Sequence, residues 1–188
     1  GRFMQEAVPV GVGGMAAIIG LTLEEVASAC WDSAKGEVVA PANQNAPDQI
    51  VIAGHSGAVN RAAALATERG AKRAIPLPVS APFHCSLMAP AQERMRGLLE
   101  AAEFRDLRFP LYNNVDAARI TKGSEARQGL IRQIASMVRW TDTVSRMRDE
   151  GVEEFVEVGP GRVLGGLIRR IVPDSVIKAV EKPAQVEE

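Results

Sequence analysis

The sequence has 188 residues, of which 46% are hydrophobic, and its formal net charge at pH 7 is −1. This length and composition can supply the core of one large domain or two small ones. The near-zero charge and scattered basic residues disfavour a nucleic-acid partner, and no apolar run approaches the roughly 20 residues that a membrane span needs.

The first residues, "RFMQEAV", are typical of the end of a helix. A helix at the very start of a sequence indicates that the chain begins inside a domain. After it, strand-like and helix-like patterns alternate as far as Pro76. The expected elements are a strand at 15–20, a helix at 21–36, strands at 37–43 and 49–54, a helix at 56–70 and a strand at 71–77.

Local signals mark the ends of these elements. Thr22 with Glu25 three residues later predicts a capping box at the start of the first helix, and Gly36 predicts its end. "QNAPD", at 44–48, reads as a turn between two strands. The resulting β-α-β-β-α-β order predicts a split βαβ, or ferredoxin-like, unit.

The segment "PVSAP", at 78–82, reads as a linker because its two prolines hold the backbone extended. A second region begins after it. The expected elements are a helix at 89–102, a strand at 110–115, helices near 124–135 and 140–150, a strand at 153–158, a helix after "GPG" and a strand at 175–180. Strands separated by helices predict parallel pairing in an α/β layer.

The run Gly54-His55-Ser56-Gly57 raises the question of a catalytic serine. A nucleophile elbow has the pattern G-x-S-x-G, and here the second glycine comes one residue early. Ser56 also stands where an N-cap hydroxyl would accept an amide hydrogen bond at the start of a helix. We therefore favour capping over catalysis for Ser56, and a hydrolase nucleophile remains the less favoured alternative.

His84 follows the linker at the junction of the two regions, and clefts between domains are preferred sites for chemistry. Cys85 lies beside it, but adjacent side chains usually point apart, so a buried, inert thiol is expected there. Cys30 and Cys85 show no pairing pattern, which favours a reducing compartment and hence the cytoplasm over a disulfide scaffold.

Several stretches together resemble the C-terminal two thirds of the malonyl-CoA:acyl-carrier-protein transacylases of bacterial fatty-acid synthesis. The stretches are "FMQEAVP", "GGMAAIIGL", "NQNAPDQIVIAGH", "GAKRAIPLPVSAPFHCSLM", "YNNVDA", "RWTDTV" and "FVEVGPGRVL". The resemblance runs from the first residue to about Val172. It implies an α/β fold in which a ferredoxin-like subdomain is inserted into an α/β-hydrolase-like acyltransferase domain, with the active site between the two.

On that resemblance, residues 1–12 are the end of a helix of the large subdomain, residues 13–77 are the ferredoxin-like small subdomain, and residues 78–188 are the C-terminal part of the large subdomain. Ser56 would then lie in the insert, away from the chemistry. The family's nucleophile elbow, Gly-His-Ser-Leu-Gly, its oxyanion motif and its malonate-binding arginine find no match in these residues. We therefore expect a fragment that is inactive alone and needs the N-terminal segment of the same enzyme.

The resemblance also implies roles for individual residues. His84 matches the general base, and an imidazole with an ordinary pKa near 6.5 can both take and return a proton at neutral pH. Gln133 matches the residue whose main-chain carbonyl accepts the other ring N–H, although its pattern alone suggests an ordinary helix-surface glutamine. Phe83, before the base, resembles the residue that favours malonyl over methylmalonyl groups, or else it packs in the core. Asn45 resembles a residue near the substrate, but its stretch also reads as a turn.

The implied reaction transfers a malonyl group from coenzyme A to the phosphopantetheine thiol of acyl carrier protein through a seryl ester. The implied partners are therefore malonyl-CoA and acyl carrier protein, with no resident cofactor or metal. Carrier proteins are acidic, so the basic residues Arg61, Arg69, Lys72 and Arg73 form a candidate docking edge, although solvated charges explain them better. The amides of "VGPGRVL" could bind an anion. A non-catalytic module that binds acyl-CoA or carrier protein is the alternative function.

Overall fold

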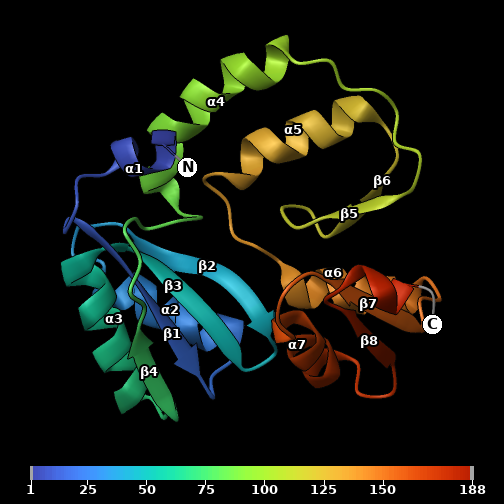
Figure 1. Cartoon of the computed structure of the whole chain (residues 1–188). Coiled ribbons are helices and arrows are strands. Elements are labelled where there is room, and N and C mark those ends of the chain that lie inside the picture. Colours follow the sequence, from blue (N-terminus) through green and yellow to red (C-terminus); the bar gives the residue numbers. More distant parts are fainter. Residues whose placement is uncertain (1, 187–188) are drawn as a thin grey trace.

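The structure is a computed structural model that describes residues 2–186 (Figure 1). Gly1 and residues 187–188, which belong to the expected segments 1–12 and 78–188, lie outside the described residues. The chain begins with helix α1 (Arg2–Ala7), as its first residues predict. Among residues 2–186, no helix is both long enough and apolar enough to cross a membrane.

Residues 13–76 form a four-stranded antiparallel sheet with two helices, here called the small lobe. Its elements are β1 (Gly13–Ile19), α2 (Leu23–Ser33), β2 (Val39–Ala46), β3 (Gln49–His55), α3 (Ser56–Glu68) and β4 (Arg73–Pro76). The strand order is β2-β3-β1-β4, so the first and third strands are central. The predicted β-α-β-β-α-β order is confirmed, as is the capping box between Thr22 and Glu25.

The boundaries of the small lobe differ from the prediction in two places. Helix α2 ends at Ser33 rather than at Gly36, and strand β2 continues to Ala46. The expected turn at 44–48 is therefore wrong in extent: only Pro47 and Asp48 connect the two strands. β2 can extend this far because register shifts accommodate Asn45 and its neighbours within the ladder.

The two faces of the small-lobe sheet carry different coverings. Helices α2 and α3 pack on one face around Ile18, Ile50 and Ile52, which are all fully buried. The opposite face packs against the segment that follows β4, through the buried side chain of Cys85 and the half-buried Phe83. This second contact fixes the segment that carries His84 directly over the sheet.

The second region contains eight helices and strands after a short 3₁₀ turn, Ser86–Met88. They are α4 (Ala89–Ala101), β5 (Leu111–Asn113), β6 (Ala118–Ile120), α5 (Gly123–Gln133), α6 (Trp140–Asp149), β7 (Glu154–Val158), α7 (Val163–Ile171) and β8 (Val176–Val180), with a final 3₁₀ turn at Pro183–Val186. Strands β7 and β8 pair in parallel across α7, as predicted. The prediction missed β6, which forms an antiparallel hairpin with β5.

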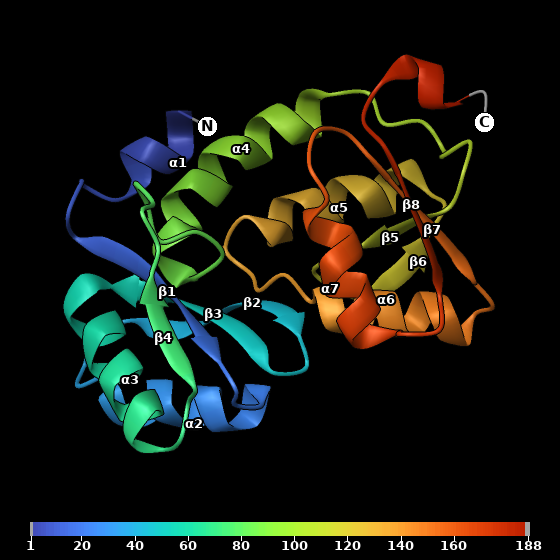
Figure 2. The same ribbon diagram turned by 60° about the horizontal axis from the view of Figure 1, so that its bottom comes forward.

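The edge of β2 joins the small lobe to the second region. The backbone of Val138, between α5 and α6, donates to the carbonyl of Ala42 and accepts from the N–H of Gln44, both at 2.9 Å. Arg170 of α7 also binds Asp48 and Gln49 at the β2–β3 turn. Both views show the tip of β2 beside α6 and α7 (Figures 1 and 2).

Candidate active site

The segment around His84 has an unusual backbone. His84 has φ of +60°, in the left-handed region that few residues other than glycine adopt. On its two sides the chain is fixed by burial: Pro82 is among the fully buried residues, and the thiol of Cys85 donates to the Pro82 carbonyl at 3.1 Å. Left-handed non-glycine residues concentrate at functional sites, where the surroundings hold them in place.

The imidazole of His84 binds the end of helix α5. Its Nδ1 lies 3.0 Å from the main-chain carbonyl oxygen of Gln133, which is the last residue of the helix. The last carbonyls of a helix have no partner within it and carry partial negative charge. Because a carbonyl oxygen only accepts, Nδ1 holds the proton and Nε2 keeps a free lone pair. Half-buried, His84 thus presents an acceptor nitrogen at the seam between the sheet and α5.

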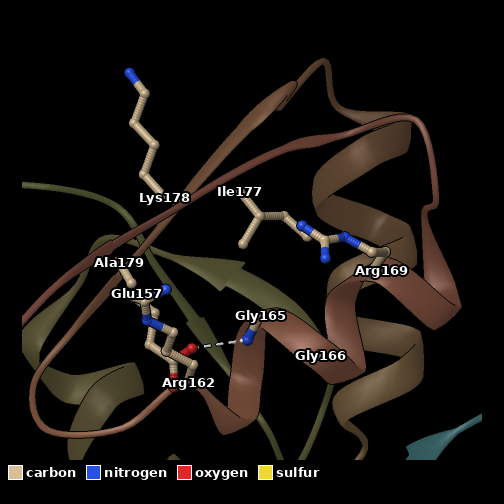
Figure 3. Close-up of a pocket in the computed structure, with 8 residues that line it drawn as sticks. All are labelled: Glu157, Arg162, Gly165, Gly166, Arg169, Ile177, Lys178 and Ala179. Carbon is tan, nitrogen blue, oxygen red and sulfur yellow. Dashed lines mark hydrogen bonds between the residues drawn. The ribbon is translucent and has the colours of Figure 1, made fainter.

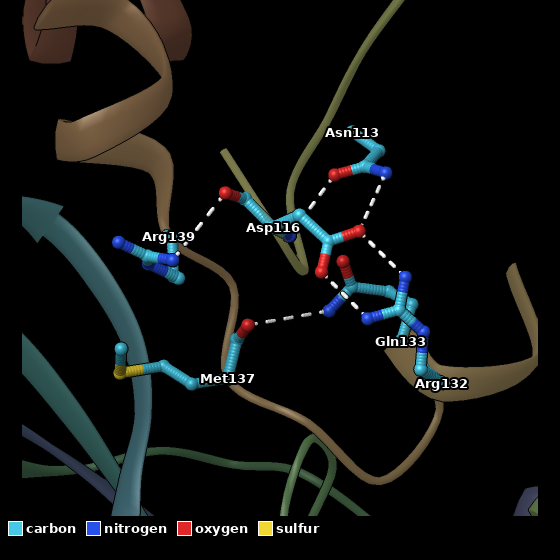
Figure 4. Close-up of polar contacts among 6 residues, drawn as sticks. All are labelled: Asn113, Asp116, Arg132, Gln133, Met137 and Arg139. Carbon is cyan, nitrogen blue, oxygen red and sulfur yellow. Dashed lines mark hydrogen bonds and ion pairs between the residues drawn. The ribbon is translucent and has the colours of Figure 1, made fainter. Parts of the chain in front are cut away.

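The side chain of Gln133 has a role of its own. Its Nε2 donates to the carbonyl oxygen of Met137 at 3.5 Å (Figure 4). It also donates to the carbonyl oxygen of Ser136 at 3.0 Å. These bonds stabilise the turn that leads from α5 to Val138, whose backbone pairs with β2. The interpretation of Gln133 as an ordinary surface glutamine is therefore wrong.

Phe83 lies between two buried clusters. It packs against the sheet-face cluster that contains Cys85, and also against a second cluster of Val8, Ala81 and Met88. Core packing, one of its two expected roles, is present. Its role in choosing the acyl group stays a prediction.

Asn45 lies in strand β2 and not in a turn, so the turn interpretation is wrong for this residue. It sits at a register shift, since Gln44 pairs with Ile50 and Ala46 pairs with Gln49. Its neighbour Gln44 is bonded on both sides: the N–H donates to Val138, and the carbonyl accepts from Thr141 at 3.0 Å. Asn45 is thus on the strand that meets the α5–α6 segment, and its substrate contact stays a prediction.

The structure gives Ser56 neither of the two expected roles. His55, not Ser56, is the N-cap residue of α3, and it makes no side-chain cap bond. The Ser56 hydroxyl donates instead to the carbonyl of Gly11 at 3.1 Å. The neighbouring imidazole is also occupied, because His55 Nδ1 accepts the N–H of Val38 at 2.9 Å. The prediction of a capping serine was therefore wrong, and the site lacks the serine–base contact that activates a nucleophile.

Gly54 in the same run is explained by packing. A Cβ at this position would lie 2.0 Å from the carbonyl oxygen of Val38, the residue just before β2. Only glycine allows the two strands to approach so closely. The elbow-like pattern therefore reflects a tight strand contact.

Two members of the basic group act within the small lobe. Arg61 donates to the carbonyls of Ser33 and Ala34 and pairs with Glu37, which satisfies the end of α2. Arg69 pairs with Asp32 on the same helix. Lys72 and Arg73 are exposed. The four residues are therefore not one free basic surface.

The backbone N–H groups at the start of α7 already bind a carboxylate of the chain itself. The carboxylate of Glu157 on β7 accepts the N–H of Gly165 at 2.8 Å (Figure 3). It also accepts the N–H of Leu164 at 3.0 Å. These bonds hold the pKa of Glu157 below its usual range. Gly165 is also closely packed, since a Cβ there would lie 3.0 Å from the side chain of Ile177. The expected anion site at "VGPGRVL" is therefore filled by the chain itself.

A polar network next to Gln133 escaped the sequence analysis. Asp116, after β5, binds Arg132 through two contacts of 2.6 Å, and Arg139 donates to the carbonyl of Asp116 at 3.3 Å (Figure 4). The one available signal was "NNVD", since asparagine and aspartate favour turns that bond their own backbone. Within residues 2–186, no group of three or more His, Cys, Asp or Glu side chains could hold a metal ion.

The chain resembles known proteins along nearly its whole length. No family model matches the chain. The chain is 50% identical over 184 residues to the malonyl CoA-acyl carrier protein transacylase of Escherichia coli K12, covering 98% of this chain and 60% of that protein. It is 42% identical over 188 residues to the protein of that name from Bacillus subtilis 168, covering 100% of this chain and 59% of that protein.

Solved structures give the same relationship. An acyl carrier protein S-malonyltransferase from Vibrio cholerae matches with a TM-score of 0.96 and 49% identity, over 99% of this chain and 61% of that chain. A malonyl-transacylase solved in complex with a type II polyketide acyl-carrier protein matches with a TM-score of 0.95 and 46% identity, over 99% of this chain and 60% of that chain. The chain thus spans about 60% of the length of these relatives. It is a homologue of the C-terminal part of malonyl-CoA–acyl carrier protein transacylases.

Proposed function

We propose that this chain is part of an enzyme that transfers a malonyl group from coenzyme A to the phosphopantetheine thiol of an acyl carrier protein. The observation that carries the proposal is the His84 imidazole, bound through Nδ1 to the Gln133 carbonyl in a strained, well-packed segment. The identity to named transacylases along nearly the whole chain supports the same reaction.

In the proposed mechanism, His84 and Gln133 act as a proton-transfer pair. Nε2 of His84 takes the proton of a serine hydroxyl as the serine oxygen attacks the malonyl thioester carbonyl. The imidazolium then protonates the departing coenzyme A thiolate. In the second half, His84 takes the proton of the phosphopantetheine thiol, whose sulfur attacks the ester, and the proton returns to the serine oxygen.

The serine nucleophile is the part of this mechanism that comes from outside these 188 residues in our proposal. The relatives are longer than this chain, which covers about 60% of the Escherichia coli protein. We propose that an N-terminal segment supplies the serine, the oxyanion hole and the group that binds the malonate carboxylate. On its own, the chain would not transfer malonate. Coenzyme A thioester enters as substrate, and the proposal involves no resident cofactor.

The surface of β7 and β8 offers a place for such a segment. Among the described residues these strands form a two-stranded parallel sheet, at the outer side of the second region (Figure 2). Parallel sheets in folded domains are normally covered on both faces. Val158, the last residue of β7, is 78% exposed, and Val163, the first residue of α7, is 72% exposed. Burial of these valines and of the free strand edges would favour association with further strands.

We assign the small lobe, with its predicted span 13–77, as a ferredoxin-like subdomain, supported by its strand order β2-β3-β1-β4. Residues 1–12 and 78–188 would then belong to an α/β-hydrolase-like large subdomain. The contact of α1 with α4, through Glu6 and Arg94, supports placing residues 1–12 with the second region.

Substrate contacts are proposed for two residues and docking for two others. Phe83, next to the base, would crowd an α-methyl group, with a discrimination of about 1–3 kcal/mol for one methyl. Asn45 would contact the acyl or pantetheine chain from β2. Exposed Lys72 and Arg73 would attract an acidic carrier protein, while Arg61 and Arg69 keep their contacts with α2.

The test is to supply the missing part. The N-terminal portion of the Escherichia coli relative that this chain does not match would be fused ahead of it, and transfer of labelled malonate from coenzyme A to carrier protein followed. We expect transfer by the fusion and a loss of about 10²–10⁴-fold in His84→Ala, the usual contribution of a general base.

His55→Asn is the matched control, because an asparagine oxygen can still accept the N–H of Val38 and the variant should retain activity. An active His84→Ala fusion would overturn the assignment. A folded fusion that binds malonyl-CoA or carrier protein but transfers nothing would favour the non-catalytic binding module instead.

A further inference from the structure

We infer that Asp116 is a positioning residue for the His84–Gln133 contact: it holds the end of helix α5 so that the Gln133 carbonyl meets the imidazole. The inference rests on the proposed function of His84 and adds a residue to it. The three residues come from separate parts of the chain, the β5–β6 hairpin, the end of α5 and the segment over the small-lobe sheet.

The first contact of Asp116 acts on the residue next to Gln133. Oδ1 and Oδ2 of Asp116 each accept from the guanidinium of Arg132 at 2.6 Å, a two-point geometry that fixes orientation as well as distance. Arg132 immediately precedes Gln133 at the end of α5. Any rotation or fraying of this last turn would therefore strain the paired contact.

The second contact acts on the far side of the α5–α6 turn. The main-chain carbonyl of Asp116 accepts from Nη1 of Arg139 at 3.3 Å, and the N–H of Arg139 donates to the carbonyl of Asn114 at 2.9 Å. The β5–β6 hairpin is thus hydrogen-bonded to the chain on both sides of Gln133, at Arg132 and Arg139 (Figure 4). Between them, the Gln133 side chain closes the turn through Ser136 and Met137.

Asp116 is itself held in place by Asn113, in addition to its contacts with the two arginines. Asn113 accepts the N–H of Asp116 at 2.9 Å and donates from Nδ2 to its carboxylate at 3.0 Å. The guanidinium of Arg132, helped by Asn113, holds the pKa of Asp116 below its usual range. An isolated surface ion pair contributes little, but a carboxylate held by Asn113 and bound by two points to Arg132 is part of a network, which can fix geometry.

The experiment measures the state of the His84 ring in the 188-residue chain, where it needs no nucleophile and no turnover. Nitrogen-15 NMR of the two histidines reports which ring nitrogen carries the proton at a pH where the ring is neutral. In the unmodified chain we expect His84 to be protonated at Nδ1. In Asp116→Asn we expect the ratio of Nδ1–H to Nε2–H to fall about tenfold, as for the loss of one ordinary hydrogen bond.

Two controls separate positioning from general damage. His55 is an internal reference, since its Nδ1 accepts from Val38 and its proton should stay on Nε2 in every variant. Glu37→Gln removes a comparable carboxylate from Arg61 in the small lobe and should leave the His84 ratio unchanged. A folded Asp116→Asn chain with an unchanged His84 ratio would overturn the inference.

Failure of this inference is distinguishable from failure of the proposed function. If the unmodified chain already lacks the Nδ1 proton on His84, the His84–Gln133 contact itself is wrong. Both the proposed base and the role of Asp116 are then overturned. If only the Asp116 variant is unchanged, the base assignment stands and Asp116 does not. Should Asp116→Asn unfold, Arg132→Lys keeps the charge but loses the two-point contact, and the same ratio then decides: a fall supports the inference and no change overturns it.

Discussion

The imidazole of His84 and the main-chain carbonyl of Gln133 are joined at 3.0 Å although 49 positions separate them in the chain. One partner lies in a left-handed segment packed on a sheet, and the other ends a helix. A helix-end carbonyl can fix the tautomer of an imidazole without a carboxylate, because it only accepts and carries partial negative charge. The geometry therefore prepares Nε2 to act as a base.

The left-handed backbone of His84 predicts an order of stability among its variants. Alanine is penalised at φ of +60° by about 1–2 kcal/mol, whereas asparagine tolerates this region. Both variants lose the ring, so their difference isolates the backbone. We expect His84→Asn to be more stable than His84→Ala by about 1 kcal/mol in urea unfolding.

Lys35 provides the matched pair, since it also has a positive φ, of 48°, and lies in the exposed turn after α2. Lys35→Asn and Lys35→Ala should differ in the same direction. Equal stabilities at position 84 together with a difference at position 35 would show that the His84 segment relaxes on substitution.

The two thiols are expected to be inert in the folded chain. Burial raises the pKa of Cys30 to about 12 and also raises the pKa of Cys85, and the residues are 2% and 3% exposed. Because the thiolate is the reactive form, neither should react with a disulfide reagent at pH 8 until denaturant is added. The single variants Cys30→Ala and Cys85→Ala assign any signal. Rapid reaction of Cys85 in the native chain would instead indicate a Cys–His pair with His84.

The Glu157 cap of α7 predicts a pH-dependent stability. Its pKa is lowered from an ordinary value of 4.5 by the amides of Gly165 and Leu164. A group with a lowered folded pKa stabilises the fold above its ordinary pKa, and that contribution is lost as the pH falls through the folded pKa. The Tm of the unmodified chain should therefore exceed that of Glu157→Gln by the largest amount near pH 7, and this difference should shrink below about pH 4.5.

Glu153→Gln is the control for this titration, because Glu153 is an exposed carboxylate immediately before β7. Its Tm difference should stay small across the same range. A Glu157→Gln difference that does not change with pH would contradict the cap.

Ser56 is expected to be unreactive. Its hydroxyl donates to the Gly11 carbonyl, and the adjacent ring nitrogen of His55 is occupied by Val38. A fluorophosphonate probe should leave Ser56 unlabelled, as judged by peptide mass spectrometry. Ser56→Ala should cost at most about 1 kcal/mol, the value of one ordinary hydrogen bond. A labelled Ser56 would restore the hydrolase interpretation.

Much of the element order was readable from the sequence because its signals are local. The capping box of Thr22 and Glu25, the short apolar runs of β1 and β3, and the helix periodicity of α3 each depend on residues a few positions apart. The misplaced end of β2 and the missed strand β6 have the opposite cause. Their pairing partners, not their own residues, decide whether such short segments are strands.

The sequence by itself determined the split of strands and helices, the resemblance to transacylases and the choice of His84 as the candidate base, since these depend on local pattern and residue type. Only the tertiary structure decided that Ser56 is bonded to Gly11, that Glu157 fills the start of α7, and that Asp116 reaches both sides of Gln133. Each of these contacts joins residues whose separation in the chain carries no distance information, because it is the packing of the sheet, the helices and the hairpin that brings them together.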